Sequence, residues 1–222
     1  YNKRCQPLYE WFPLRGTLLA WRETYMENLN IGRSGIEVPF LGMGTWAIGG
    51  GGWDYAWGAQ KDQDSIEAIL ESLECGVNWI DTAAAYGLGH SEEIVGKALK
   101  QWGRPVIVAT KCGLLGDPDG HVRGCLKRES ILKEAEASLK RLQVDRIDLY
   151  QIHWPNPAPD IEEAFETLID LQKQGKIRYA GVSNFSSKQM EKISAKGPIA
   201  SLQPPYSLLN RYAEKDLFPY CE

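Results

Sequence analysis

Four residues whose side chains can hold or transfer a proton stand at or just after the ends of short apolar runs: Asp81, Tyr86, Lys111 and His153. The runs that precede Asp81, Lys111 and His153 cover residues 77–80, 106–110 and 147–152. Tyr86 lies five residues after Asp81, in the same segment. Short apolar runs of this kind are typical of buried strands, so the pattern predicts chemistry at strand ends.

The chemistry of these four side chains is complementary. A phenol ordinarily titrates near pH 10, and an ammonium group beside it favours the phenolate, so we expect Lys111 to lower the pKa of Tyr86. Asp81 is expected to hold Lys111 in place and keep it charged. Histidine can donate a hydrogen bond to a carbonyl oxygen that gains negative charge. The set is suited to the reduction of a carbonyl group.

The elements that position these residues alternate between strands and helices. Parallel strands are expected at residues 40–44, 77–80, 106–110, 147–152, 176–182 and 199–203, with a short β-hairpin over residues 29–38 before them. In an α/β barrel the catalytic groups come from the carboxyl ends of several strands, which meet on one face. The sequence therefore predicts an α/β fold, a (β/α)8 TIM barrel truncated after about six βα units and preceded by that hairpin.

The expected helices have recognisable first residues. A capping box is expected where Asp64 is followed three residues later by Glu67, and Ser91 is expected to cap the second helix. A third helix is expected over residues 128–142, and a fourth from Asp160 to Gly175. Ser186 with Gln189 predicts a second capping box, at the start of a fifth helix.

Composition limits the classes of function. The chain has 222 residues, 43% of them hydrophobic, and a net charge of -4, which argues against a nucleic-acid surface. It contains no run of 18 apolar residues, so no membrane span is expected. Its five scattered cysteines predict reduced thiols in a cytoplasmic protein. Residues 1–25 show no hydrophobic period and are expected to be an irregular, non-native or upstream extension, with the barrel domain over residues 26–222.

Two other site types are disfavoured. Residues 42–47 match the dinucleotide pattern G-x-G-x-x-A, but further glycines and tryptophans follow where that motif needs a helix. Only three histidines are present, without a His-x-His pair or a paired carboxylate cluster, so no metal site is expected. His90 and His121 are expected to lie in loops.

Several separate motifs together resemble the aldo-keto reductase family, most closely its bacterial-type subgroup, from about residue 26 to the last residue. The matching segments are Gly44-Thr45-Trp46, Asp81-Thr82-Ala83, Tyr86-Gly87, Ala109-Thr110-Lys111, Leu149 to Pro155, Gly181 to Phe185 and Gln203 to Tyr206. Each segment alone is a weak signal, and jointly they are specific.

The resemblance implies a barrel that binds NADP without a Rossmann domain and reduces aldehydes or ketones. It implies that Tyr86 is the general acid, that Lys111 and Asp81 support it, and that His153 orients the carbonyl group. The residues that it places at the cofactor are Gly44, Thr45 and Trp46 beside the nicotinamide ribose, Asp81, and Ser183, Asn184 and Gln203 at the carboxamide. Trp46 and Trp154 are implied to be walls of the substrate pocket.

One departure from the family pattern concerns the end of the sequence. The strands that would be the seventh and eighth, with the ring and basic loops that they supply to the cofactor, are absent, so we expect the isolated 222 residues to be inactive and the full-length protein to be active. The expected partner is a small-molecule carbonyl substrate. An alternative is a cofactor-sensing binding module resembling potassium-channel β-subunits. The choice of substrate, the choice between NADP and NAD, and the oligomeric state are left open.

Overall fold

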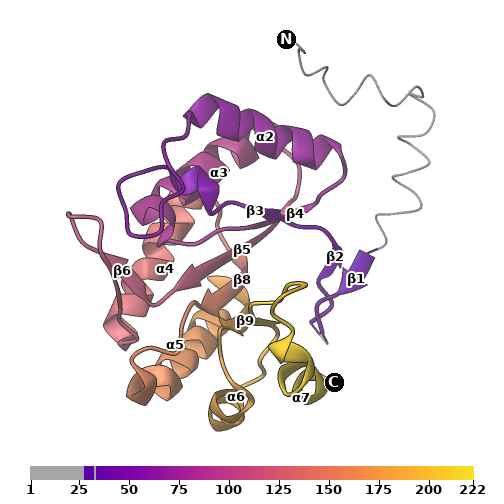
Figure 1. The fold of residues 1–222 in the computed structure, drawn as a ribbon, viewed down its shortest axis with the longest axis vertical. Helices are drawn as coiled ribbons and strands as arrows, with labels where there is room; N and C mark the ends of the chain where they lie inside the picture. Colours follow the sequence, from indigo (N-terminus) through magenta and orange to yellow (C-terminus); the bar gives the residue numbers. More distant parts are fainter. Residues whose placement is uncertain (1–27, 33) are drawn as a thin grey trace.

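A computed structural model of the chain describes residues 28–32 and 34–222 (Figure 1). Six parallel strands form a curled sheet, a half-barrel, in the order β10-β9-β8-β5-β4-β3. Their bounds are β3 (Met43–Gly44), β4 (Trp79–Asp81), β5 (Ile107–Cys112), β8 (Ile147–Ile152), β9 (Ile177–Ser183) and β10 (Leu202–Gln203). The predicted truncated barrel is confirmed. The expected irregular segment, residues 1–25, lies outside the described residues.

Two antiparallel hairpins accompany this sheet. β1 (Asn28–Asn30) pairs with β2 (Glu37–Pro39), which confirms the predicted hairpin. The second hairpin, β6 (Leu114–Gly116) with β7 (Val122–Gly124), follows β5 and was not predicted. Its strands are three residues long and lack the apolar alternation that marks a strand in sequence. It projects away from the helices at the left of Figure 1.

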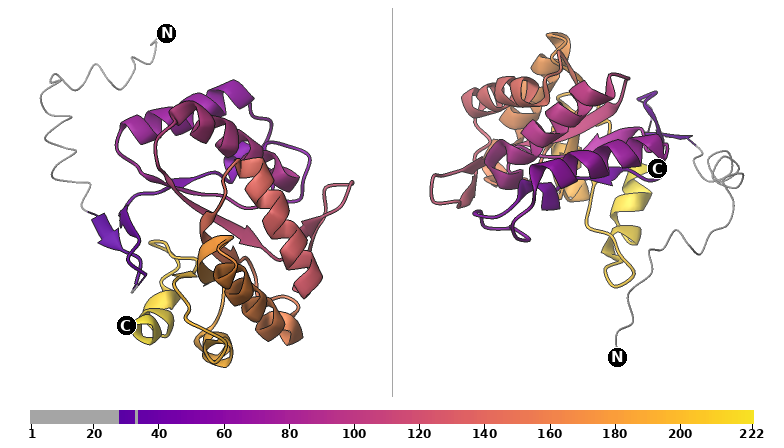
Figure 2. Two further views of the ribbon diagram at one scale, coloured as in Figure 1. Left: turned by 180° about the vertical axis from the view of Figure 1, so that it is seen from behind. Right: turned by 90° about the horizontal axis from the view of Figure 1, so that it is seen from above.

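Helices pack against the curled sheet, and the two in its middle, α4 (Arg128–Leu142) and α5 (Ile161–Lys173), are seen in front of the strands in the left view of Figure 2. The α-helices are α2 (Asp62–Glu74), α3 (His90–Trp102), α4 (Arg128–Leu142), α5 (Ile161–Lys173), α6 (Ser187–Ser194) and α7 (Leu217–Cys221). Short 3-10 helices are η2 (Ala47–Gly49), η3 (Tyr86–Gly89), η4 (Ala158–Asp160) and η5 (Tyr212–Glu214). No helix among the described residues has the length and apolar character needed to cross a membrane.

The core explains why these segments form these elements. Strand residues such as Ile80, Val108 and Tyr150 are fully or almost fully buried against the apolar stripes of the helices. The helical residues that meet them include Ile69, Leu73, Ile94, Val95, Ala98, Ile131, Ala135, Leu142, Phe165 and Leu168. Burial against the helices explains why these strands are rich in apolar side chains.

Helix starts show which capping predictions hold. The predicted capping box at the start of α6 is present, since the Ser186 hydroxyl accepts from the backbone N–H of Gln189 and the Gln189 side chain reaches back. The predicted box at Asp64 is wrong, because α2 begins two residues earlier, at Asp62. Asp64 lies in the first turn instead, where a carboxylate favours the positive end of the helix dipole.

Two further predicted starts differ in the structure. Ser91 does not cap α3, which begins at His90 after Gly89, a residue in the left-handed region with φ 103°. His90 is therefore helical rather than a loop residue. Asp160 precedes α5 without a side-chain capping hydrogen bond, and its carboxylate accepts from Lys127 Nζ at 2.8 Å. At α3 the left-handed Gly89 stands where the cap was expected. At α5 the carboxylate of Asp160 makes a contact distant in sequence in place of a local cap.

Candidate active site

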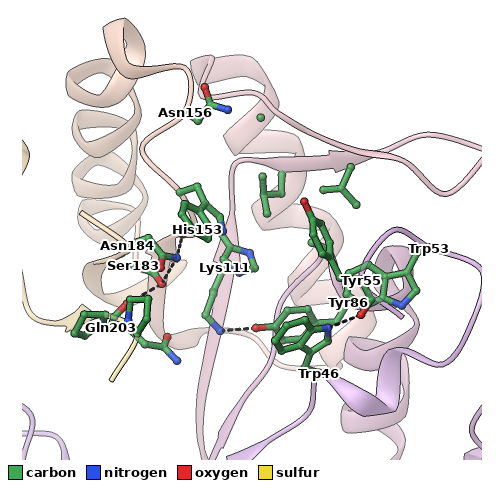
Figure 3. A pocket seen from close by; sticks show the side chains of 17 residues that line it. Trp46, Trp53, Tyr55, Tyr86, Lys111, His153, Asn156, Ser183, Asn184 and Gln203 are labelled. Atoms are coloured by element: carbon green, nitrogen blue, oxygen red, sulfur yellow. Dashed lines mark hydrogen bonds between the residues drawn. The ribbon is translucent and has the colours of Figure 1, made fainter. Parts of the chain in front are cut away.

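The ends of β4 and β5 bring a lysine, a carboxylate and a phenol together. Lys111, on β5, donates to both carboxylate oxygens of Asp81, at 2.7 and 2.8 Å, and to the carbonyl oxygen of Thr82 at 2.9 Å. Its Nζ lies 3.4 Å from the phenol oxygen of Tyr86 (Figure 3). The Lys111 side chain is 2% exposed and that of Asp81 is 16% exposed. The ammonium group is therefore almost fully surrounded by oxygen atoms.

His153 follows β8 and faces the same phenol. Its backbone N–H donates to the carbonyl oxygen of Cys112 at 2.9 Å, and its ring meets the Tyr86 ring edge-on with 5.7 Å between centroids. Nδ1 is buried and has no hydrogen-bond partner among the described residues. Burial, and then the nearby Lys111 cation, lower the pKa of His153 to about 3. The imidazole is thus neutral at physiological pH and still carries one N–H donor.

The predicted direction of the Tyr86 pKa is wrong. Burial of the phenol raises its pKa above the usual value of 10 and outweighs the opposing effect of Lys111, while the Asp81 carboxylate adds to the increase. Lys111 does favour the phenolate, as expected, but burial of the phenol has the larger effect. Tyr86 therefore keeps its proton at neutral pH, which is the form of a proton donor.

Two glycines fix the turn that presents Tyr86. Gly87 has a φ of 60°, and a side chain there would place a Cβ 2.1 Å from the carbonyl oxygen of Gly49. A Cβ on Gly49 would in turn lie 2.7 Å from the backbone nitrogen of Gly87. Because no side chain fits between the two segments, the glycine run of the sequence lets one backbone pack directly against the turn after Tyr86.

A buried hydroxyl network ties the strand ends to α3. The Thr45 hydroxyl donates to the carbonyl oxygen of Asp81 at 3.0 Å, and the Ser91 hydroxyl donates to the carbonyl oxygen of Thr45 at 2.9 Å. Thr82 and Ser91 hydroxyls lie 3.1 Å apart, and all three side chains are fully buried. The Thr45 side chain is therefore structural, and only its backbone and that of Gly44 remain to meet a cofactor.

The ends of β9 and β10 supply a group of amides and a hydroxyl. Asn184 has a φ of 62°, and its Nδ2 donates to the carbonyl oxygen of His153 at 2.9 Å and to Ser183 Oγ at 3.0 Å. Ser183 Oγ donates to the backbone oxygen of Gln203 at 3.0 Å, and Gln203 Nε2 to Asp81 Oδ2 at 3.3 Å. Within the described chain, the amide oxygens of Asn184 and Gln203 have no hydrogen-bond partner. They are acceptors suited to an amide-bearing ligand, such as a carboxamide.

One pocket of about 610 Å³ is lined by six of these residues, whereas Asp81, Gly44 and Thr45 do not line it (Figure 3). The six are Tyr86, Lys111, His153, Ser183, Asn184 and Gln203. The wall of the pocket is aromatic: Trp46 stacks on Tyr86 with 6.2 Å between centroids and a 15° tilt, and Trp154 also lines it. Lining residues that the sequence did not identify are Trp53, Tyr55, Ala85, Leu114, Val122, Gly124, Asn156, Pro204 and Pro205. The density of tryptophan and tyrosine in the glycine-rich segment was the available signal for Trp53 and Tyr55.

A half-barrel with proton-donating and amide groups at the carboxyl ends of its strands defines an α/β-barrel protein whose site suits proton transfer to a small molecule. Among residues 28–32 and 34–222, no group of three histidine, cysteine, aspartate or glutamate side chains could hold a metal ion. The chain belongs to the aldo/keto reductase family, whose family model matches residues 40–222.

Relatives and solved structures agree with this assignment. The aldo-keto reductase YhdN of Bacillus subtilis is 48% identical over 89% of this chain and 59% of its own length. The NADH-specific methylglyoxal reductase of Escherichia coli is 39% identical over 88% of this chain and 64% of its own. The glycerol dehydrogenase AKR11B4 of Gluconobacter oxydans has a TM-score of 0.79 at 42% identity, over 88% of this chain and 60% of that one.

A further structure shows a bound cofactor. An aldo-keto reductase from Klebsiella pneumoniae in complex with NADPH has a TM-score of 0.73 at 28% identity, over 88% of this chain and 64% of that one. In all these comparisons the chain spans about three fifths of the length of the protein that it matches.

Proposed function

We propose that the full-length protein reduces aldehyde or ketone groups of small molecules to alcohols with a nicotinamide cofactor, and that Tyr86 is the general acid. The observation that carries this proposal is the convergence of Tyr86, Lys111 and His153 at one pocket, with Lys111 Nζ 3.4 Å from the phenol oxygen. A phenol with a buried ammonium group and a neutral imidazole N–H beside it supplies what a developing alkoxide needs.

Each residue has a distinct part in this mechanism. The protonated Tyr86 gives its proton to the carbonyl oxygen as negative charge develops there, and Lys111 stabilises the phenolate that remains. Asp81 holds Lys111 by its bidentate contact. The neutral imidazole of His153 offers an N–H that orients the carbonyl group without competing as an acid.

The amide group at the β9 and β10 ends fits the cofactor. Asn184 and Gln203 present acceptor oxygens, and Ser183 lies between them, so these three would hold the nicotinamide carboxamide. Gly44, Thr45 and Trp46 would lie beside the ribose. When bound, the reduced nicotinamide supplies the hydride. We assign NADPH as the cofactor, in line with the Klebsiella structure, and the NADH-specific Escherichia coli relative makes NADH the comparison to assay.

The direct test is Tyr86→Phe in the full-length protein. Loss of the general acid should lower the rate of aldehyde reduction by about 10²- to 10⁴-fold. The dissociation constant of NADPH should stay nearly unchanged, because the ring and its stacking on Trp46 remain. The measurements are NADPH oxidation by absorbance and cofactor binding by fluorescence titration.

Tyr212→Phe, at an exposed tyrosine of η5 whose hydroxyl has no hydrogen bond within the described chain, is the matched control and should reduce aldehydes at the wild-type rate. Reduction by Tyr86→Phe at a similar rate would reject the assigned acid. Tight cofactor binding without turnover by the wild-type protein would instead favour the cofactor-sensing module.

A further inference from the structure

One wall of the pocket consists of two segments that are distant in sequence. Residues 50–58, which we call the aromatic loop, contribute Trp53 and Tyr55, and hairpin β6–β7 contributes Leu114, Val122 and Gly124. Trp53 is buried and its ring lies 6.1 Å from that of Tyr86. Any shift of the aromatic loop relative to the hairpin would therefore change the space in front of the phenol.

A single carboxylate joins the two segments. Asp54 Oδ1 lies 2.9 Å from His121 Nδ1, and Asp54 Oδ2 accepts from the backbone N–H of Val122 at 2.8 Å. The backbone N–H of Asp54 donates to the carbonyl oxygen of Gly120 at 3.0 Å. Three hydrogen bonds thus connect one residue of the aromatic loop to three successive residues of the hairpin, more than 60 positions away.

Close backbone packing supports the same junction. Gly120 has a φ of 90°, and a Cβ there would lie 2.4 Å from the carbonyl oxygen of Gly52. The turn of the hairpin is itself ordered, because Asp117 Oδ1 accepts from the backbone N–H groups of Asp119 and His121. The hairpin is therefore held in a defined shape and pressed against the aromatic loop.

We propose that Asp54 is a positioning residue that ties the aromatic loop to hairpin β6–β7 and so sets the width of the substrate pocket, and that protonation of His121 tightens this tie. The proposal rests on the carbonyl reductase function proposed above. Asp54 acts through Trp53 and Val122, its neighbours on the two walls, and has no part in proton transfer.

The direction of the pH effect follows from the charges at the junction. The groups that act on His121 are Asp54, from the aromatic loop, and Asp117, from the hairpin turn, and these carboxylates raise the pKa of His121 above 6.5. Below that pKa the imidazolium and the carboxylate form an ion pair, and above it only a neutral hydrogen bond remains. The tie weakens as pH rises, so the KM for substrate should rise with pH.

The test compares variants of Asp54 and His121 in benzaldehyde reduction with NADPH. Asp54→Ala loses both side-chain bonds and should raise the KM for benzaldehyde about fivefold, with kcat within about twofold of wild type. Asp54→Asn should recover part of this change, because its amide oxygen still accepts from Val122. His121→Gln should raise the KM for benzaldehyde by about twofold at pH 6. It should also remove most of the pH dependence of this KM between pH 6 and 9.

A second pair provides the control. His90 Nε2 lies 2.9 Å from Asp62 Oδ1, the same distance as between His121 and Asp54. This pair joins α3 to α2 and does not line the pocket. His90→Gln should therefore leave the KM and its pH dependence as in the wild type. An equal effect of His90→Gln and His121→Gln on the pH profile of KM would overturn the proposal.

Hydrogen–deuterium exchange gives a readout that needs no turnover. In Asp54→Ala the amide of Val122 should exchange faster than in the wild type, while the amides of β5 and β8 keep their rates. Unchanged exchange at Val122, or faster exchange without a change of KM, would refute the role of Asp54. A wild-type protein that reduces no aldehyde would refute the proposed reductase function instead, and the exchange result would still report on the tie.

Discussion

A basic side chain pairs with a carboxylate both at the strand ends and in the loops around the pocket, but the first pair is buried and the second is largely exposed. Lys111 and Asp81 meet at 2.7 Å with side chains 2% and 16% exposed. His121 and Asp54 meet at 2.9 Å, but their side chains are 71% and 33% exposed. A buried pair is costly to break and holds one geometry, whereas an exposed pair contributes little and adjusts easily. The chemistry lies on the rigid part of the protein and the shape of the pocket depends on the adjustable part.

The two histidines show the same contrast in their pKa values. Burial lowers the pKa of His153 to about 3, whereas the carboxylate beside the exposed His121 raises its pKa. One imidazole is therefore neutral across the physiological range, and the other keeps its proton to a higher pH than an ordinary imidazole does. Surroundings, rather than residue type, decide which histidine can respond to pH.

Removal of the buried cation should have the largest effect. Lys111→Met leaves the Asp81 carboxylate without its partner and should lower the free energy of unfolding by about 3 kcal/mol. Reduction of aldehydes should fall by at least about 10²-fold, because Tyr86 loses the group that stabilises its phenolate. Urea denaturation and steady-state kinetics of the full-length protein measure the two quantities.

Lys127→Met is the control for that substitution. Lys127 also meets an aspartate, Asp160, at 2.8 Å, but its side chain is 60% exposed. Its loss should leave both the unfolding free energy and the turnover close to wild type. Equal destabilisation by the two lysine substitutions would show that burial does not distinguish these pairs.

The acid side of the stability profile tests His153. Its pKa in the folded protein, about 3, is below the unfolded value near 6.5, so the unfolded chain binds more protons and the unfolding free energy falls as pH falls from 6.5 toward 3. Between pH 6.5 and 5 this contribution should be about 1.5 kcal/mol, and His153→Asn should remove it. A His153→Asn protein with the wild-type slope would contradict a buried neutral imidazole. His121 should act oppositely, since its stabilising effect is present below 6.5 and lost as pH rises through its raised pKa.

A smaller effect is expected from a carboxyl group beneath the strand ends. Glu134 accepts from the backbone N–H of Gly113 at 2.9 Å, two residues after Lys111, and burial raises its pKa to about 7. Because this value is above the ordinary 4.5, its contribution to stability is complete below pH 4.5 and is lost as pH rises through 7. Glu134→Gln should remove a fall of about 1 kcal/mol in unfolding free energy between pH 5 and 6. Denaturation of both proteins at the two pH values measures the difference.

Strand ends were predictable because the signal is local. Short apolar runs ended by Asp81, Lys111 and His153 predicted one shared face, and the structure brings these side chains together with Tyr86 through direct contacts. The capping box at Ser186 was equally readable, since both partners lie within four residues. Fold class and the position of the pocket therefore follow from the sequence.

Features that depend on distant contacts were not predictable. The raised pKa of Tyr86 results from burial, which the spacing of residues does not encode. Ser91 reads as a helix cap, but its hydroxyl bonds Thr45, 46 residues away. Similarly, the sequence indicates an ordinary loop residue at His121, because its partner Asp54 lies 67 positions earlier and the hairpin that contains His121 lacks an apolar period.

The backbone contact between Gly49 and Gly87 sets a boundary for protein engineering. A library designed to broaden substrate range would naturally randomise the glycine-rich segment, since Trp46 and Trp53 line the pocket. Gly49 should be kept constant in such a library, because even alanine there would push the turn that carries Tyr86 out of place. Diversity is better introduced at Tyr55, which is 56% exposed and has no ring contact with Tyr86 in the described chain.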